Sequence, residues 1–262
     1  MNKINIKKHL SILLSFVFLS LFSTASMAKP AEIAFQKQKI TTAQQTQLCA
    51  LLKDDCQDQA QWQFYKAKQH YYLINQLKLY QFSMGSQQHL QLEQQWDFST
   101  YQPDTQHPRW ATLLDQENQL SIFPKLFPLN AHDDAIGIVQ TWNEGYSGGG
   151  MSEEVVDFVQ LKPNGQYVPI FQNIPLSMYR MIRACFSEAD YMEAKQQCHD
   201  DYQLDTQIDY VKPGTWKVKY HYQIDYSPAS DSGVKPFSEH KSFLLERNAA
   251  DAIVLPKAWL DN

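Results

Sequence analysis

Apolar and polar residues alternate without interruption along residues 215–226. The even positions are all apolar or aromatic: Trp216, Val218, Tyr220, Tyr222, Ile224 and Tyr226. Successive side chains of a strand point to opposite faces, so the pattern predicts a strand with one buried and one solvated face. Residues 204–210 alternate in the same way, and the Lys212-Pro213-Gly214 segment between the two runs has the composition of a turn.

The parity of these two runs predicts the register of the hairpin that they form. Residues directly opposite each other share a face, and a two-residue loop would place Tyr210 opposite Lys217, which mismatches the faces. A three-residue loop matches them and gives the pairs Tyr210–Trp216, Ile208–Val218 and Leu204–Tyr222. We therefore predict an antiparallel hairpin with an odd loop.

Several other segments read as strands. Residues 70–82 are rich in Tyr, Leu and Ile, and in residues 90–98 the apolar residues Leu90, Leu92, Trp96 and Phe98 share one parity. Residues 136–142 and 155–161 are predicted to pair across a long connection, 143–153. A further strand at 238–247 is expected to join the sheet of the hairpin after a loop at 227–236.

Helices are few. Thr42 is suited to cap a helix with Gln45 three residues later, and Leu48, Leu51 and Leu52 give that helix an apolar stripe. A second, short helix is expected near residues 188–197, behind Ser187. With many strands and no regular strand–helix alternation, the predicted class is mainly β or α+β. It would comprise antiparallel sheets, a short N-terminal helix and one short disulfide-flanked helix.

The N-terminus has the three zones of a secretory signal peptide. Lys3, Lys7 and Lys8 precede an apolar run at residues 10–22, and Ser26-Met27-Ala28 offers small residues for cleavage after Ala28. Ala25 is the alternative cleavage site, and the apolar run is short for an uncleaved anchor helix. We expect a signal peptide at 1–28 and a single globular domain at 29–262. That domain would be helical to about residue 62 and β-rich afterwards, and the protein would be periplasmic or secreted.

Four cysteines follow the predicted signal peptide: Cys49, Cys56, Cys185 and Cys198. Four cysteines allow three pairings, and an even number in an oxidising compartment favours disulfides. We predict the local pairs Cys49–Cys56 and Cys185–Cys198. Residues seven apart on one helix lie too far apart to bond, so the helix carrying Cys49 should end at residues 53–55. The alternative, a metal site of Cys185, Cys198 and His199, lacks a zinc-type spacing, and no metal is expected.

Net charge narrows the classes of partner. The first 28 residues hold three of the 23 basic residues and none of the 28 acidic ones, which leaves a net charge of about −8 on the rest with His neutral. Nucleic acids and anionic membrane surfaces require a basic footprint, so neither is expected as a partner. No second stretch is long and apolar enough to predict a membrane span.

One motif has a catalytic appearance. Residues 145–149 match G-x-S-x-G, the nucleophile elbow of α/β-hydrolases, in which a serine sits on a tight strand-to-helix turn. On this hypothesis Ser147 is the nucleophile, His240 (or His221) the base, and Asp209 (or Asp200 or Asp205) the residue that orients the histidine. The chain lacks the strand–helix alternation of that fold, which favours a glycine-rich loop that joins two strands.

The remaining candidates concern binding. Tyr146, Gly148 and Gly149 would present a loop surface, and Arg180 and Arg183, two of only four arginines, could grip a carboxylate. Trp110, Tyr146 and Trp259 are candidates for exposed aromatic side chains. The favoured hypothesis is an exported binding protein without a cofactor, acting on an extracytoplasmic protein as an inhibitor or immunity protein would. A serine hydrolase and a structural envelope protein are the alternatives.

Overall fold

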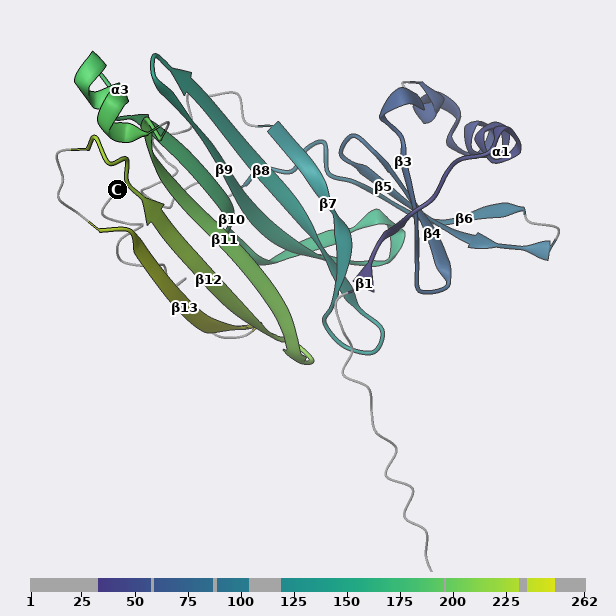
Figure 1. Ribbon diagram of the computed structural model, residues 1–262. Helices are drawn as coiled ribbons and strands as arrows, with labels where there is room; N and C mark the ends of the chain where they lie inside the picture. The colour runs from purple at the N-terminus through teal and green to yellow at the C-terminus, as the bar shows by residue number, and fades with distance from the viewer. Residues whose placement is uncertain are drawn as a thin grey trace, which may run out of the picture.

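The described residues form two antiparallel sheets and two short α-helices, as a computed structural model shows (Figure 1). The structure describes residues 33–57, 59–86, 89–103, 119–195, 197–230 and 235–247. The predicted signal peptide, Trp110 and Trp259 lie outside the described residues. The prediction of a mainly β protein with antiparallel sheets is confirmed. In the described part of the chain, no helix has the length and hydrophobicity needed to cross a membrane.

The N-terminal sheet has five strands that lie side by side in sequence order. They are β2 (Gln36–Lys37), β3 (Gln63–Ala67), β4 (His70–Asn75), β5 (Lys78–Met84) and β6 (Leu90–Asp97). The segment 70–82, predicted as strand, is a hairpin of β4 and β5 that turns at Gln76 and Leu77, where Gln76 has a φ of 54°.

Helix α1 (Thr42–Leu52) packs on one face of the N-terminal sheet. Its Leu48 and Leu52 are buried against an apolar cluster made of Trp62, Phe64, Leu73, Tyr80, Phe82 and Leu90. The helix is capped by Thr41 in a reciprocal capping box with Gln44, so the predicted cap, Thr42 with Gln45, was wrong by one residue. Both threonines have a hydroxyl that can accept the capping hydrogen bond. The helix begins at Thr42, so the residue before it, Thr41, is the cap.

Helix α1 ends at Leu52, as the disulfide prediction required. Lys53 has a φ of 49°, and residues Lys53–Cys56 form a 3₁₀ turn that brings the Cα atoms of Cys49 and Cys56 to 4.8 Å. The predicted Cys49–Cys56 disulfide is thereby confirmed.

The C-terminal sheet has eight strands, of which the last seven follow the sequence order. They are β7 (Gln119–Pro128), β8 (Asp134–Tyr146), β9 (Gly149–Leu161), β10 (Tyr167–Arg183), β11 (His199–Lys212), β12 (Thr215–Asp225) and β13 (Phe237–Glu246). The eighth, β1 (Ile33–Ala34), pairs with β7 and sends the chain on to β2 in the other sheet. The strand predicted at 238–247 is confirmed as β13, paired with β12.

The β11–β12 hairpin has the predicted register. Tyr210 lies opposite Trp216, and the pairs Ile208–Val218 and Leu204–Tyr222 follow. The prediction ascribed this register to a three-residue loop. It arises instead from a two-residue turn at Pro213-Gly214 together with a bulge at Val211. Gly214 has a φ of 71°, which favours glycine at the second turn position.

The long connection predicted at 143–153 is wrong. Strands β8 and β9 extend through it, from Tyr146 back to Gly149, and only Ser147 and Gly148 form the turn. Backbone hydrogen bonds between strands need no particular side chains, so a segment rich in Gly and polar residues can pair as well as an apolar one.

Two clusters of buried side chains lie on the C-terminal sheet. One, which includes Ile122, Ile136, Ile138 and Val159, packs against Tyr72, Leu79, Trp96 and Phe98 of the N-terminal sheet and its end. The other centres on Trp216, whose ring lies 4.9–5.3 Å from those of Phe127, Phe158 and Phe171. Because these contacts join β12 to β7, β9 and β10, the sheet curls so that its C-terminal strands cover its earlier ones.

Candidate functional site

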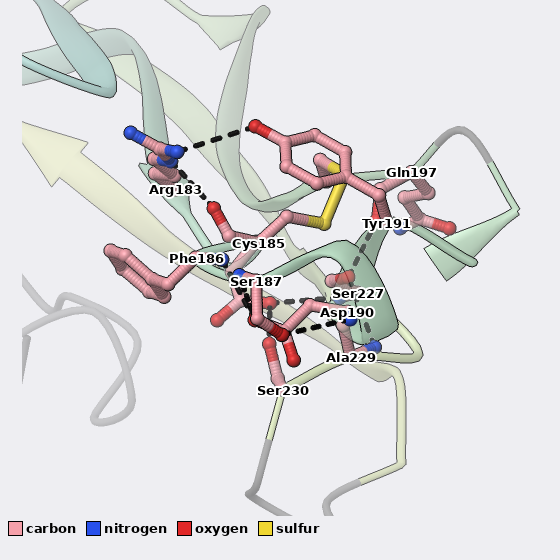
Figure 2. The surroundings of a disulfide bond; sticks show 12 residues. Arg183, Cys185, Phe186, Ser187, Asp190, Tyr191, Gln197, Ser227, Ala229 and Ser230 are labelled. Carbon is pink, nitrogen blue, oxygen red and sulfur yellow. Dashed lines mark hydrogen bonds between the residues drawn. A yellow bond between two sulfur atoms is a disulfide. The ribbon is translucent and has the colours of Figure 1, made fainter. Parts of the chain in front are cut away.

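A stapled turn joins β10 to β11 and projects from the end of the C-terminal sheet (Figures 1 and 2). It comprises residues 183–198, and we name it the disulfide knuckle. Cys185 and Cys198 form the predicted disulfide, with Cα atoms 5.1 Å apart, and the backbone N–H of Ala184 donates to the carbonyl of Cys198 at 2.9 Å. Cys185 is fully buried, so the staple is anchored in the protein, while most of the described residues between the cysteines are exposed and Ala194 is buried.

Helix α3 (Glu188–Ala194) forms the outer part of the knuckle, where the sequence predicted a short helix behind Ser187. Ser187 caps it in a reciprocal capping box with Asp190. The Asp190 carboxylate also accepts from the backbone N–H of Phe186 at 2.8 Å. The hydrogen bond from the Phe186 N–H lowers the pKa of Asp190 most, and the bonds from Ser187 add to this effect. The same bonds fix the backbone of Phe186 relative to the helix.

The base of the knuckle is tied to the segment that follows β12. The Ser227 hydroxyl donates to the carbonyl of Gln197 at 2.5 Å. The Asp200 carboxylate accepts from the Ser227 backbone at 2.8 Å and from the Ser230 hydroxyl at 2.6 Å; Figure 2 labels Ser227 and Ser230. The knuckle is therefore held on both sides, by the disulfide and by these hydrogen bonds.

Three large apolar or aromatic side chains stand exposed on this fixed base. Phe186 is 74% exposed, Met192 79% and Tyr191 52%. Single exposed apolar residues are common on protein surfaces, but a group of them within one short turn makes that turn a candidate interaction surface.

Arg183 lies between the two exposed aromatic rings. Its Nε donates to the carbonyl of Cys185 at 2.6 Å, its Nη2 donates to the Tyr191 hydroxyl at 3.3 Å, and its guanidinium carbon lies 5.3 Å from the centre of the Phe186 ring (Figure 2). Arg183, the first residue of the knuckle, is thus linked to both aromatic residues. It bonds to the Tyr191 hydroxyl and makes a cation–π contact with the Phe186 ring.

The β8–β9 turn packs directly against Arg183. Gly148 has a φ of 98°, and a Cβ placed on it would come within 2.8 Å of the Cβ and Cδ atoms of Arg183. The neighbouring Gly149 is in register with Ile182. The structure therefore brings together Gly148, Gly149 and Arg183, three of the residues that the sequence nominated for binding. Ser147 is exposed at the tip of the turn, and the side chain of Tyr146 lies outside the described part of the protein.

Arg180 does not share the surface of Arg183. The two residues are three apart on a regular stretch of β10, so their side chains point to opposite faces. The guanidinium of Arg180 lies 5.5 Å from the centre of the Tyr202 ring, whereas that of Arg183 faces the knuckle. The structure thus gives no support for a carboxylate grip formed by the pair.

The residues of the predicted hydrolase triad are spread over the sheet. Strand β9, not a helix, follows Ser147, so the elbow geometry is absent. Gly149 of β9 and Asp200 of β11 both pair with Ile182 of β10, which lies between them. Asp209 lies nine residues farther along β11, about 30 Å from Asp200 along the strand. His240 on β13 stacks on His221, and Asp209 accepts from Lys219 and Gln207. The structure brings no two of the three residues together.

Phe186, Tyr191 and Met192 were missed in the sequence. Tyr191 and Met192 read as the apolar positions of a short helix, which normally face a core, and Phe186 lies just before the cap of that helix. The signal that could have identified them is the short spacing between Cys185 and Cys198. A local disulfide of this kind closes a short connection, and connections usually lie at the surface.

Comparison of the chain with protein-family models, curated proteins and solved structures gave no match.

Proposed function

We propose that this protein is an exported binding protein that docks an extracytoplasmic protein through the disulfide knuckle. The observation that carries the proposal is the exposure of Phe186, Tyr191 and Met192 on the knuckle, where Arg183 contacts Phe186 and Tyr191. Aromatic residues, Met and Arg are the residue types enriched at the centres of protein–protein interfaces, and few such residues supply most of the binding energy.

The rigidity of the knuckle supports the same proposal. Ordering a mobile loop on binding costs about 0.5–1.5 kcal/mol for each immobilised side chain. In the knuckle the disulfide, the capping box and the bonds of Arg183 already fix the backbone, and Arg183 holds the ring of Tyr191. A partner would therefore meet a surface whose ordering cost is already met within the folded protein.

Export is supported by two independent features. Residues 1–28 carry the pattern of a cleavable signal peptide, and all four cysteines are paired in disulfides. Structural disulfides are typical of proteins that fold in an oxidising compartment.

The loss of binding free energy expected on mutation of the knuckle can be worked out from its two most exposed side chains. Burial of a Phe or Met side chain contributes about 1.5–3 kcal/mol. Truncation of both Phe186 and Met192 to Ala should therefore remove about 3–6 kcal/mol, which weakens the complex by at least about 100-fold.

A capture experiment tests the proposal. Tagged, oxidised protein is mixed with the extracytoplasmic fraction, and bound proteins are identified by mass spectrometry. Three baits are compared: wild type, the double variant Phe186→Ala/Met192→Ala, and the control Val168→Ala/Leu244→Ala. The control removes two exposed apolar side chains, 48% and 46% exposed: Val168 lies at the end of β10 far from the knuckle, and Leu244 lies on β13.

We expect one partner at near-stoichiometric amounts on wild type and on the control, and none on the knuckle variant. Equal thermal unfolding of the three baits establishes that the fold is unchanged. Equal capture by the knuckle variant and wild type would contradict the proposal, and so would a complete absence of any partner.

A further inference from the structure

A row of three titratable side chains crosses the outer face of the last three strands. Asp205 on β11 is in register with His221 on β12, which is in register with His240 on β13. The imidazole rings of His221 and His240 are stacked, with centres 4.4 Å apart and planes 6° from parallel. All three side chains are at least partly accessible to solvent, and the row lies away from the knuckle.

The surroundings of the two rings differ from the rest of this face. The neighbouring polar side chains interact with one another. Lys219 forms an ion pair with Asp209, and hydrogen bonds join Gln203 to Asp205, Gln207 to Asp209 and Gln223 to Asp225. The imidazoles instead face each other, and the Nε2 atom of His221 lies 3.1 Å from the Ser238 hydroxyl. The ammonium of Lys219 lies 2.5 Å from the Asp209 carboxylate, so the nearest positive charge on β12 already has a counter-ion.

Two imidazoles side by side can chelate a transition metal. Metal–nitrogen bonds of about 2.0–2.1 Å place the two coordinating nitrogens about 3.4 Å apart in a tetrahedral site. The lone pairs of an imidazole lie in the plane of its ring, so two nearly parallel rings cannot both point at one ion until a ring turns. Rotation about χ1 and χ2 of the exposed His240 to another allowed rotamer can direct one nitrogen of each ring to a shared position. No group of three or more His, Cys, Asp or Glu side chains is already arranged for a metal within the described ranges. The two imidazoles would therefore be the anchor, and water and the neighbouring Asp205 would complete the coordination.

We propose that His221 and His240, with Asp205 beside them, form a surface site for a divalent transition-metal ion, Cu²⁺ or Zn²⁺. Imidazole suits both ions, and the general order of affinities places Cu²⁺ above Zn²⁺ at a site of this kind. The site has a structural consequence. Because β13 pairs with β12 on one side only within the described strands, an ion held by one ligand from each strand fastens an edge strand to the sheet.

Titration with the metal alone tests the site. Untagged, oxidised protein is titrated with CuCl₂ and with ZnCl₂ in a calorimeter, and the nitrogen ligands of bound Cu²⁺ are counted by electron paramagnetic resonance. We expect one ion per chain with two imidazole nitrogens, tighter binding of Cu²⁺, and a thermal unfolding midpoint that rises with Zn²⁺ concentration.

Matched variants locate the ion. His221→Ala and His240→Ala should each weaken binding by about tenfold or more and abolish the shift in unfolding midpoint, because each removes one of two anchoring ligands. Asp205→Asn should weaken binding less. His132→Ala and His199→Ala are the controls and should leave binding unchanged. Absence of binding by the wild-type protein would overturn the proposal, and so would binding that survives loss of both His221 and His240.

Discussion

Two glycines near Ser147, Gly145 and Gly148, provide a matched pair of substitutions. Gly145 is a glycine of the G-x-S-x-G motif, whereas Gly148 occupies its variable position. In this structure their environments differ. Gly148 has a φ of 98° and meets Arg183, whereas Gly145 lies within β8 with no heavy atom within 4 Å of the position that a Cβ would take. We therefore expect Gly148→Ala and Gly145→Ala to have different effects.

The cost of Gly148→Ala follows from two contacts. A left-handed backbone conformation costs an L-residue about 1–2 kcal/mol. A Cβ at 2.8 Å from two atoms of Arg183 requires that side chain to move, and overpacking of this kind costs about 1–3 kcal/mol. The loss of glycine flexibility in the unfolded chain offsets about 0.4–1 kcal/mol. The net destabilisation is about 1–4.6 kcal/mol, or about 2–18 °C in unfolding midpoint for a protein of this size.

Gly145→Ala lacks both penalties and keeps the gain from the unfolded state, so its unfolding midpoint should equal or exceed that of wild type. Thermal unfolding followed by circular dichroism measures both variants. Amide hydrogen exchange of residues 183–191 then reports whether a displaced Arg183 loosens the knuckle. Equal destabilisation by the two variants, or a Gly148→Ala protein as stable as wild type, would refute the assignment of Gly148 to a turn packed on Arg183.

Two further predictions concern stability. Trp216→Ala removes three ring contacts and the bond from Nε1 to the Pro128 carbonyl, and should cost about 3–5 kcal/mol in urea unfolding; a loss below about 1 kcal/mol would contradict the curled sheet. Hydrogen bonds from Lys78 and Tyr80 hold the pKa of Asp55 below its usual value. A lowered carboxyl pKa stabilises the folded state above about pH 4 and less as pH falls further, so the stability difference between wild type and Asp55→Asn should shrink below pH 4; a constant difference would contradict the pairing.

The parts of the fold that were predictable are those in which neighbouring side chains carry the information. The register of β11 and β12 follows from the alternation around Trp216, because a shift by one residue would turn the apolar face toward water. The end of helix α1 follows from the predicted Cys49–Cys56 pair, since residues seven apart on one continuous helix lie too far apart to form a disulfide. In both cases only a few adjacent residues decide the outcome.

The remaining parts depend on contacts between segments far apart in the chain. The turn at Ser147 looked like a loop because its residues have little strand propensity, whereas the pairing of β8 with β9 is set by the apolar stretches farther along both strands. The exposure of Phe186 and Met192 depends on how the knuckle projects from the sheet, which no local pattern records. Arg183 was nominated from its rarity alone, and only the structure places it between two aromatic rings.

The sequence-ordered arrangement of β7 to β13 has a consequence for how the protein reaches its native state. Each strand hydrogen-bonds to the one that precedes it in the chain, and both disulfides join residues 7 and 13 positions apart. Backbone pairing from β8 to β13 thus joins strands that are neighbours in the sequence, and pairing of neighbouring strands closes shorter loops than pairing of distant ones. The pairing of β1 with β7 is an exception, since it joins segments separated by the whole N-terminal sheet. We infer a vectorial assembly in which successive hairpins add to a growing edge as the chain emerges, each cysteine pair oxidising within its own hairpin-sized segment.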